Sequence, residues 1–189
     1  MSRAQRRSRP AVKNVILGVT GSIAAYKAAD IANELTKAGN SVDVILTSGG
    51  AQFITPLTLQ TLSKNPVCAD MFDIRRPHEV EHISLAQKAD LLLIAPASAD
   101  VIGKLAHGIA DDMLTTVVLA LGDIPKLIAP AMNTRMYQNP LTQANIATLR
   151  TVGFNFIEPR VGYLAEGHVG LGPMEEVEVI VRRVQQALA

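Results

Sequence analysis

Short runs of aliphatic and β-branched residues alternate with longer helical stretches along almost the whole chain, and this alternation constrains the fold most. The clearest run covers residues 89–95, and similar runs lie at 12–19, 42–46, 126–129 and 155–158. Continuous apolar runs are typical of parallel strands covered on both faces, and parallel neighbours require crossover helices. We therefore predict one α/β domain with a Rossmann-like (flavodoxin-like), doubly wound parallel sheet.

The intervening stretches carry apolar residues at helical spacing. Pro56 must kink its helix or begin a new one, because its ring does not fit a helix interior. The chain divides into a disordered basic tail at 1–11 and a domain at 12–189, in which a glycine-rich, flexible substrate flap is expected at 160–174. Helices are predicted at 24–35, 51–62, 82–88, 101–106, 113–120, 142–152 and 175–189.

Hydrophobic residues make up 48% of the 189 residues and charged residues 19%, which is slightly more apolar than an average soluble domain. No apolar run is long enough to span a bilayer, so we expect no membrane partner. The apolar surplus must be buried in the sheet, a ligand pocket or subunit interfaces, and we expect a homo-oligomer. The net charge of +1 gives no field that favours nucleic acid.

The N-terminal basic segment and the single cysteine bear on localisation. Residues 3–9 contain four arginines but lack the apolar h-region of a signal peptide, which argues against a secretory signal. A disordered tail is the simpler interpretation, and an arm that docks a leader peptide is the alternative. Cys68 cannot form an intrachain disulfide, so the composition fits the reducing cytoplasm. We expect Cys68 to be buried and to have no catalytic role.

Small and polar residues follow four of the predicted strands, at 20–22, 47–49, 96–99 and 130–133. In a doubly wound sheet these strand ends meet at one edge, where ligands bind. The segment 18–23 resembles a phosphate loop without the lysine of a Walker A motif, and it suits a single phosphate better than a dinucleotide. A tight turn is the alternative for that segment, as a helix N-cap is for Ser98 in the loop at 96–99.

Two residues are candidates for the reacting centre. His82 follows two nearby carboxylates, although a lone histidine at a helix start is more often structural or solvated. The amide of Asn133 is suited to donate to a substrate carboxylate or a developing oxyanion, and a helix N-cap is its alternative role. No spacing indicates a metal site, and the G-x-S-x-G motif of serine hydrolases is absent.

Together these motifs resemble the flavin-containing cysteine decarboxylases. That family includes the phosphopantothenoylcysteine decarboxylases of coenzyme A synthesis and the peptidyl-cysteine decarboxylases of lantibiotic-type peptides. The resemblance covers residues 13–172. It rests on the segments 18–27, 53–60, 96–100 and 130–137, of which the last reads Pro-Ala-Met-Asn-Thr-Arg-Met-Tyr, and on His82.

The resemblance implies subunits assembled into homotrimers, often four trimers to a homododecamer, with FMN near a subunit interface. It implies that His82 is the catalytic acid or base and that Asn133 holds the substrate carboxylate, with Met136 and Glu166 also contacting the substrate. FMN would oxidise the cysteine to a thioaldehyde, which loses CO₂ readily to give an ene-thiol. The implied FMN contacts are Gly21, Ser22, Ile23, Ser48, Phe53, Ala97, Ser98, Ala99, Asp100 and Met132.

The predicted flap departs from the family pattern. Many coenzyme A enzymes carry a cysteine where Glu166 stands, and that cysteine helps to reduce the ene-thiol. Its absence favours a reaction that stops at the ene-thiol of a peptidyl cysteine, with phosphopantothenoylcysteine decarboxylation as the alternative. A flavin-binding regulatory subunit is disfavoured because the chain lacks an acidic extension. A prenyl-flavin synthase is disfavoured by His82 and the segment 130–137.

Overall fold

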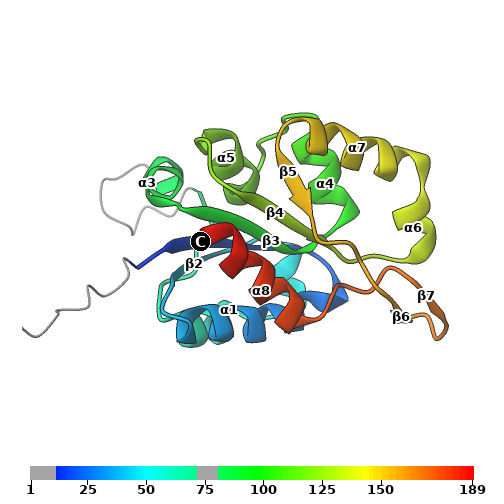
Figure 1. Ribbon diagram of the computed structural model, residues 1–189, viewed down its shortest axis with the longest axis horizontal. Coiled ribbons are helices and arrows are strands. Elements are labelled where there is room, and N and C mark those ends of the chain that lie inside the picture. The colour runs from blue at the N-terminus through cyan, green and yellow to red at the C-terminus, as the bar shows by residue number, and fades with distance from the viewer. Residues whose placement is uncertain (1–11, 72–80) are drawn as a thin grey trace, which may run out of the picture.

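The computed structural model describes residues 12–71 and 81–189, so the predicted tail at 1–11 lies outside the described residues. Five parallel strands form one sheet in the order β2-β1-β3-β4-β5 (Figure 1). This order confirms the predicted Rossmann-like, flavodoxin-like fold. The strands are β1 (Asn14–Val19), β2 (Ser41–Leu46), β3 (Leu91–Ala97), β4 (Lys126–Pro130) and β5 (Phe154–Phe156).

The helices follow the predicted positions with three differences. The helix predicted at 24–35 is divided into a 3₁₀ helix at 23–26 and an α-helix at 27–37. The segment predicted as one helix at 51–62 is divided into η2 (Gly50–Gln52) and α2 (Pro56–Ser63), because Pro56 begins the second helix after the Thr55 cap. The short helix α6 (Thr134–Gln138) was not predicted. The others are η1 (Ile23–Tyr26), α1 (Lys27–Lys37), α3 (Glu81–Lys88), α4 (Ala99–Ala106), α5 (Met113–Ala120), α7 (Pro140–Thr151) and α8 (Val177–Leu188).

Helices cover both faces of the sheet (Figure 1). Apolar residues of α1, α2 and α8 pack on one face, and those of α3, α4, α5 and α7 pack on the other. Every residue of β3 is buried, as expected for a central strand with helices on both sides. Among the described residues, no helix is both long and apolar enough to cross a bilayer.

The segment at 160–174 was expected to be a flexible flap, and in the structure it contains a β-hairpin that the sequence analysis did not predict. Strands β6 (Val161–Tyr163) and β7 (Val169–Leu171) pair antiparallel and project from the right-hand end of the molecule in Figure 1. The Met132 N–H donates to the carbonyl of Gly172 at 3.2 Å and fixes the base of the hairpin to the end of β4. A Cβ at Gly172 would overlap the Met132 carbonyl oxygen, so this close approach requires glycine.

Candidate functional site

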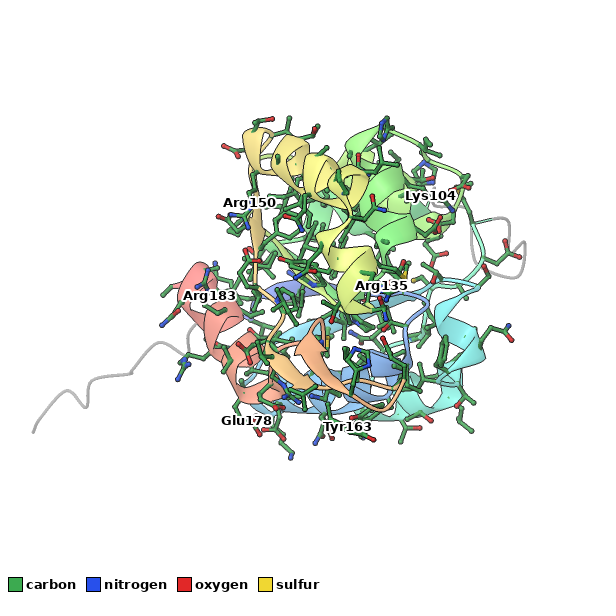
Figure 2. All side chains as sticks on the ribbon, turned by 90° about the vertical axis from the view of Figure 1, so that its right-hand side faces the viewer. Lys104, Arg135, Arg150, Tyr163, Glu178 and Arg183 are labelled. Carbon is green, nitrogen blue, oxygen red and sulfur yellow. The ribbon has the colours of Figure 1, made fainter. Side chains whose placement is uncertain are left out.

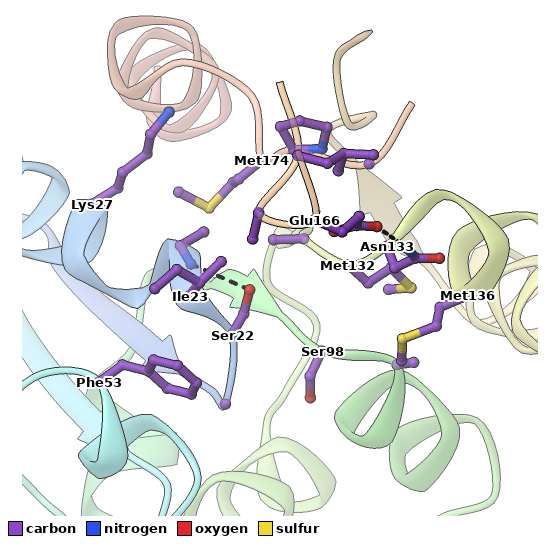
Figure 3. A pocket seen from close by; sticks show the side chains of 18 of the residues that line it. Ser22, Ile23, Lys27, Phe53, Ser98, Met132, Asn133, Met136, Glu166 and Met174 are labelled. Carbon is purple, nitrogen blue, oxygen red and sulfur yellow. Dashed lines mark hydrogen bonds between the residues drawn. The ribbon is translucent and has the colours of Figure 1, made fainter. Parts of the chain in front are cut away.

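A cavity of about 490 Å³ opens at the carboxyl edge of the sheet, between the ends of β1, β3 and β4 and beneath the hairpin (Figure 3). This position is the switch point between β1 and β3, where flavodoxin-like sheets bind ligands. Figure 2 looks onto this end of the molecule, with α6 and Arg135 above the hairpin and Tyr163, which belongs to β6, at its lower side. The predicted site residues that line the cavity are Gly21, Ser22, Ile23, Phe53, Ser98, Ala99, Met132, Asn133, Met136 and Glu166.

Thr20 joins the ends of β1 and β3 beneath the cavity. Its hydroxyl is buried, donates to the Pro96 carbonyl at 2.8 Å and accepts from the Ser98 N–H at 2.9 Å. The Ala131 N–H donates to the Ala97 carbonyl at 3.1 Å and joins the end of β3 to the end of β4. Three strand ends are thereby fixed relative to one another, and sequence reasoning missed the contribution of Thr20.

The loops after β1 and β2 approach each other closely at two glycines. A Cβ at Gly21 would lie 3.2 Å from the Gly49 Cα, which is tighter than an ordinary contact. Ser22 then caps η1, its hydroxyl accepting from the Ala24 N–H at 3.3 Å. The cavity wall here is therefore mostly backbone, and it lies at the start of η1.

The loop after β3 supplies a second wall of small residues. Ser98 caps α4 by accepting from the Val101 N–H at 3.3 Å, so the alternative role considered for it is present, and Ser98 also lines the cavity. Ala97 is fully buried within β3 and lies behind this wall. Asp100 points to solvent and forms an ion pair with Lys104 at 3.4 Å.

Asn133 has the N-cap role that the sequence left open, and its role toward a substrate carboxylate stays a prediction. Its Oδ1 accepts from the Arg135 N–H at 2.7 Å, which caps α6. Because the cap occupies the oxygen, the Nδ2 donor faces the cavity, where it donates to the Glu166 carboxylate (Figure 3). The cap therefore orients the amide as a hydrogen-bond donor toward whatever the cavity holds.

Two cations on the cavity wall share one carboxylate. Lys27 Nζ lies 3.1 Å from Glu176 Oε2, and Arg160 Nε lies 2.9 Å from Glu176 Oε1. The hydrogen bond and charge of Lys27 lower the pKa of Glu176. The cluster carries a net positive charge suited to an anion. Among the described residues, no group of three His, Cys, Asp or Glu side chains is placed to hold a metal ion.

Four predicted site residues do not line the cavity: Ser48, His82, Ala97 and Asp100. His82 lies half-buried in the first turn of α3. Its neighbour Glu81 accepts from the buried Cys68 thiol at 3.0 Å, and Cys68 bridges to β2, so this turn lies beside the end of β2. The roles of these four residues, like those of the ten that line the cavity, stay predictions.

Comparisons with known proteins identify the family. The Flavoprotein family model matches residues 2–189. A probable phosphopantothenoylcysteine decarboxylase of Streptococcus mutans is 50% identical over 177 residues, which cover 93% of this chain and 99% of that protein. The coenzyme A biosynthesis bifunctional protein CoaBC of Bacillus subtilis is 49% identical over 177 residues, covering 94% of this chain but 43% of CoaBC.

Solved structures agree with these sequence relatives. A PPC decarboxylase mutant complexed with pantothenoylaminoethenethiol superposes with a TM-score of 0.85 at 32% identity, covering 93% of this chain and 98% of the other. The FMN-dependent cysteine decarboxylase SpaF gives a TM-score of 0.79 at 30% identity, with coverages of 94% and 98%. The expected flavin-containing cysteine decarboxylase relationship is confirmed. The chain belongs to the Flavoprotein family.

Proposed function

We propose that this chain is an FMN-dependent decarboxylase of phosphopantothenoylcysteine in coenzyme A biosynthesis. The observation that carries the proposal is the cavity at the switch point, which brings Ser22, Ser98 and Asn133 of three family motifs together. Glu166 alone favoured a peptidyl-cysteine substrate. The sequence relatives reverse that preference, because the full-length match is named a phosphopantothenoylcysteine decarboxylase and the next is a coenzyme A enzyme.

The residues of the cavity fit FMN. The small side chains of Gly21 and Ala99 leave room for a flat ring against backbone, and Phe53 and Met132 add apolar and polarizable surface. The start of η1 suits the FMN phosphate. We propose that the ten predicted residues that line the cavity hold the cofactor and the substrate, with Ser48, Ala97 and Asp100 as outer contacts.

Asn133 holds the substrate carboxylate in this proposal. When bound, FMN would supply the two-electron oxidation of the cysteine to a thioaldehyde, from which CO₂ departs readily, and would return the two electrons to the remaining ene-thiol to give the saturated thiol. The Nδ2 donor of Asn133 orients the carboxylate, and Met132 and Met136 shield it from water. Lys27 and Arg160 supply positive charge for a phosphate, a group that a peptide ending in cysteine lacks.

We propose that His82 acts as acid or base from a neighbouring chain of a homo-oligomer. The proposal is supported by the apolar residues exposed around the cavity mouth: Ile23 at 60%, Tyr26 at 58% and Phe53 at 48% exposure. Mixing inactive His82→Asn chains with inactive Asn133→Asp chains should restore part of the activity, since one site then has both residues. Mixtures that stay inactive after subunit exchange would contradict this arrangement.

The test of the function is mass spectrometry of the FMN-loaded protein with phosphopantothenoylcysteine. We expect loss of CO₂ alone, giving 4′-phosphopantetheine, and complementation of a coenzyme A auxotroph. His82→Asn and Asn133→Asp should both give folded, yellow and inactive protein, the latter because its charge repels the substrate carboxylate. Unchanged substrate with the wild-type protein would refute the proposal.

A second candidate is the oxidative decarboxylation of a peptide ending in cysteine. Glu166 favours it, because the family cysteine that helps to reduce the ene-thiol is missing at this position. The same assay with such a peptide would then show loss of CO₂ and two hydrogens. Complementation without peptide turnover excludes this candidate.

A further inference from the structure

The contact between Asn133 and Glu166 joins the cavity floor to the tip of the hairpin (Figure 3). Asn133 has two N–H bonds on Nδ2, and its oxygen is already committed to the cap of α6. One N–H of the amide that the proposed function assigns to the substrate carboxylate is therefore engaged by a carboxylate of the protein itself. Within residues 12–71 and 81–189, Glu166 makes no ion pair, and its side chain accepts a hydrogen bond from the Asn133 amide.

The hairpin holds Glu166 over the cavity by contacts that do not involve its side chain. Leu164 is buried, its N–H donates to the His168 carbonyl at 2.8 Å, and the Gly167 N–H donates to the Leu164 carbonyl at 3.0 Å. These bonds close a tight turn around Glu166, while Gly172 fastens the hairpin base to Met132. The base is thus fixed and the tip is exposed, which allows the tip to move separately.

We propose that Glu166 is a specificity-determining residue whose carboxylate occupies the position of the substrate carboxylate when no substrate is bound. The inference rests on the proposed function, which assigns Asn133 to that group. Two carboxylates on one amide repel each other, so a carboxylate-bearing ligand binds only after Glu166 has left. Once CO₂ has departed, the ligand no longer competes for Asn133, and return of Glu166 favours product release.

The expected effect is a selective gain of affinity in Glu166→Ala. If the open hairpin accounts for about a tenth of the molecules, removing the competing carboxylate tightens binding of a carboxylate ligand about tenfold. A ligand without the carboxylate does not compete with Glu166, and its affinity is unchanged. Because Glu166 is exposed at a turn, the substitution leaves the core intact.

The experiment compares two unreactive ligands on the FMN-loaded protein by calorimetry. One is the serine analogue of phosphopantothenoylcysteine, which keeps the carboxylate and replaces the thiol by a hydroxyl. The other is the same molecule without the carboxylate. Glu166→Ala should bind the first about tenfold more tightly than wild type and the second equally, with Glu166→Gln intermediate. The matched control is Asp123→Ala, which removes an exposed carboxylate away from the cavity and from Lys27 and should change neither affinity.

Equal affinity of wild type and Glu166→Ala for the serine analogue would overturn the inference. An equal gain for both ligands would also overturn it, since Glu166 would then act as a general lid. Turnover of phosphopantothenoylcysteine by the wild-type protein in parallel separates the two proposals. If turnover is observed while the affinities do not change, the proposed function stands and the role of Glu166 is wrong. If neither binding nor turnover occurs, both are wrong.

Discussion

Replacing Thr20 by valine keeps the shape of a buried side chain and removes only its hydroxyl. Thr20 is only 1% exposed. Its hydroxyl donates to the Pro96 carbonyl at 2.8 Å and accepts from the Ser98 N–H at 2.9 Å. The Pro96 carbonyl keeps a second donor, the Thr20 N–H at 3.3 Å, whereas the Ser98 N–H loses its hydrogen-bond acceptor. The substitution removes both hydrogen bonds of the hydroxyl and leaves the Ser98 N–H without an acceptor. We expect this to lower the free energy of unfolding by about 2 kcal/mol.

The loss should appear in denaturant unfolding of the FMN-free protein and as a fall in Tm of about 4–8 °C for a chain of this size. Because Ser98 lies on the cavity wall, FMN affinity measured by flavin fluorescence should also fall, by about tenfold. Thr20→Ser keeps the hydroxyl and should retain FMN affinity. In Thr148→Val, an exposed hydroxyl bonded to the Ala144 carbonyl at 3.0 Å is lost, and stability should change by less than about 0.5 kcal/mol. If Thr20→Val changes stability no more than this control, the bridging role is wrong.

Two further perturbations test other parts of the site. Gly21→Ala places a Cβ 3.2 Å from the Gly49 Cα and should weaken FMN binding about tenfold. Gly122→Ala is the control, because open space surrounds Gly122, and it should leave FMN affinity unchanged. Equal FMN affinities of the two variants would contradict the close approach. Burial, with the hydrogen bond to Glu158 adding to it, raises the pKa of Tyr137 to about 12. Since the folded-state pKa exceeds the unfolded value, the stability from the neutral phenol is full below about pH 10 and is lost as the pH rises to about 12. A tyrosinate absorbance titration should show a step near pH 12 that is absent in Tyr137→Phe, and its persistence there would refute the assignment.

Local patterns predicted the frame of the site. The alternation of apolar runs with helices was sufficient for a parallel sheet, because parallel strands cannot pair without crossover connections. An N-cap could be considered as the alternative role of Ser98 and Asn133 because each accepts from an N–H only two or three residues further along the chain. Such short-range bonds leave a sequence signature.

The hairpin and the charges around it left no such signature. Each hairpin strand has three residues, too few for an apolar alternation to be read, and the hairpin depends on packing against the end of β4. Lys27 and Glu176 are 149 positions apart, so their ion pair exists only once α1 and α8 lie on the same face of the sheet. The pair belongs to the tertiary structure because charge complementarity depends on distance in space.

The sequence by itself determined the sheet, its ligand-binding edge, the caps and the family, since these follow from local periodicity and contiguous motifs. Only the tertiary structure decided that Thr20 joins two strand ends across 76 positions, that Glu166 meets Asn133, and that His82 stays outside the cavity of a single chain. Contacts of that kind join residues far apart along the chain, so no local pattern in the sequence encodes them.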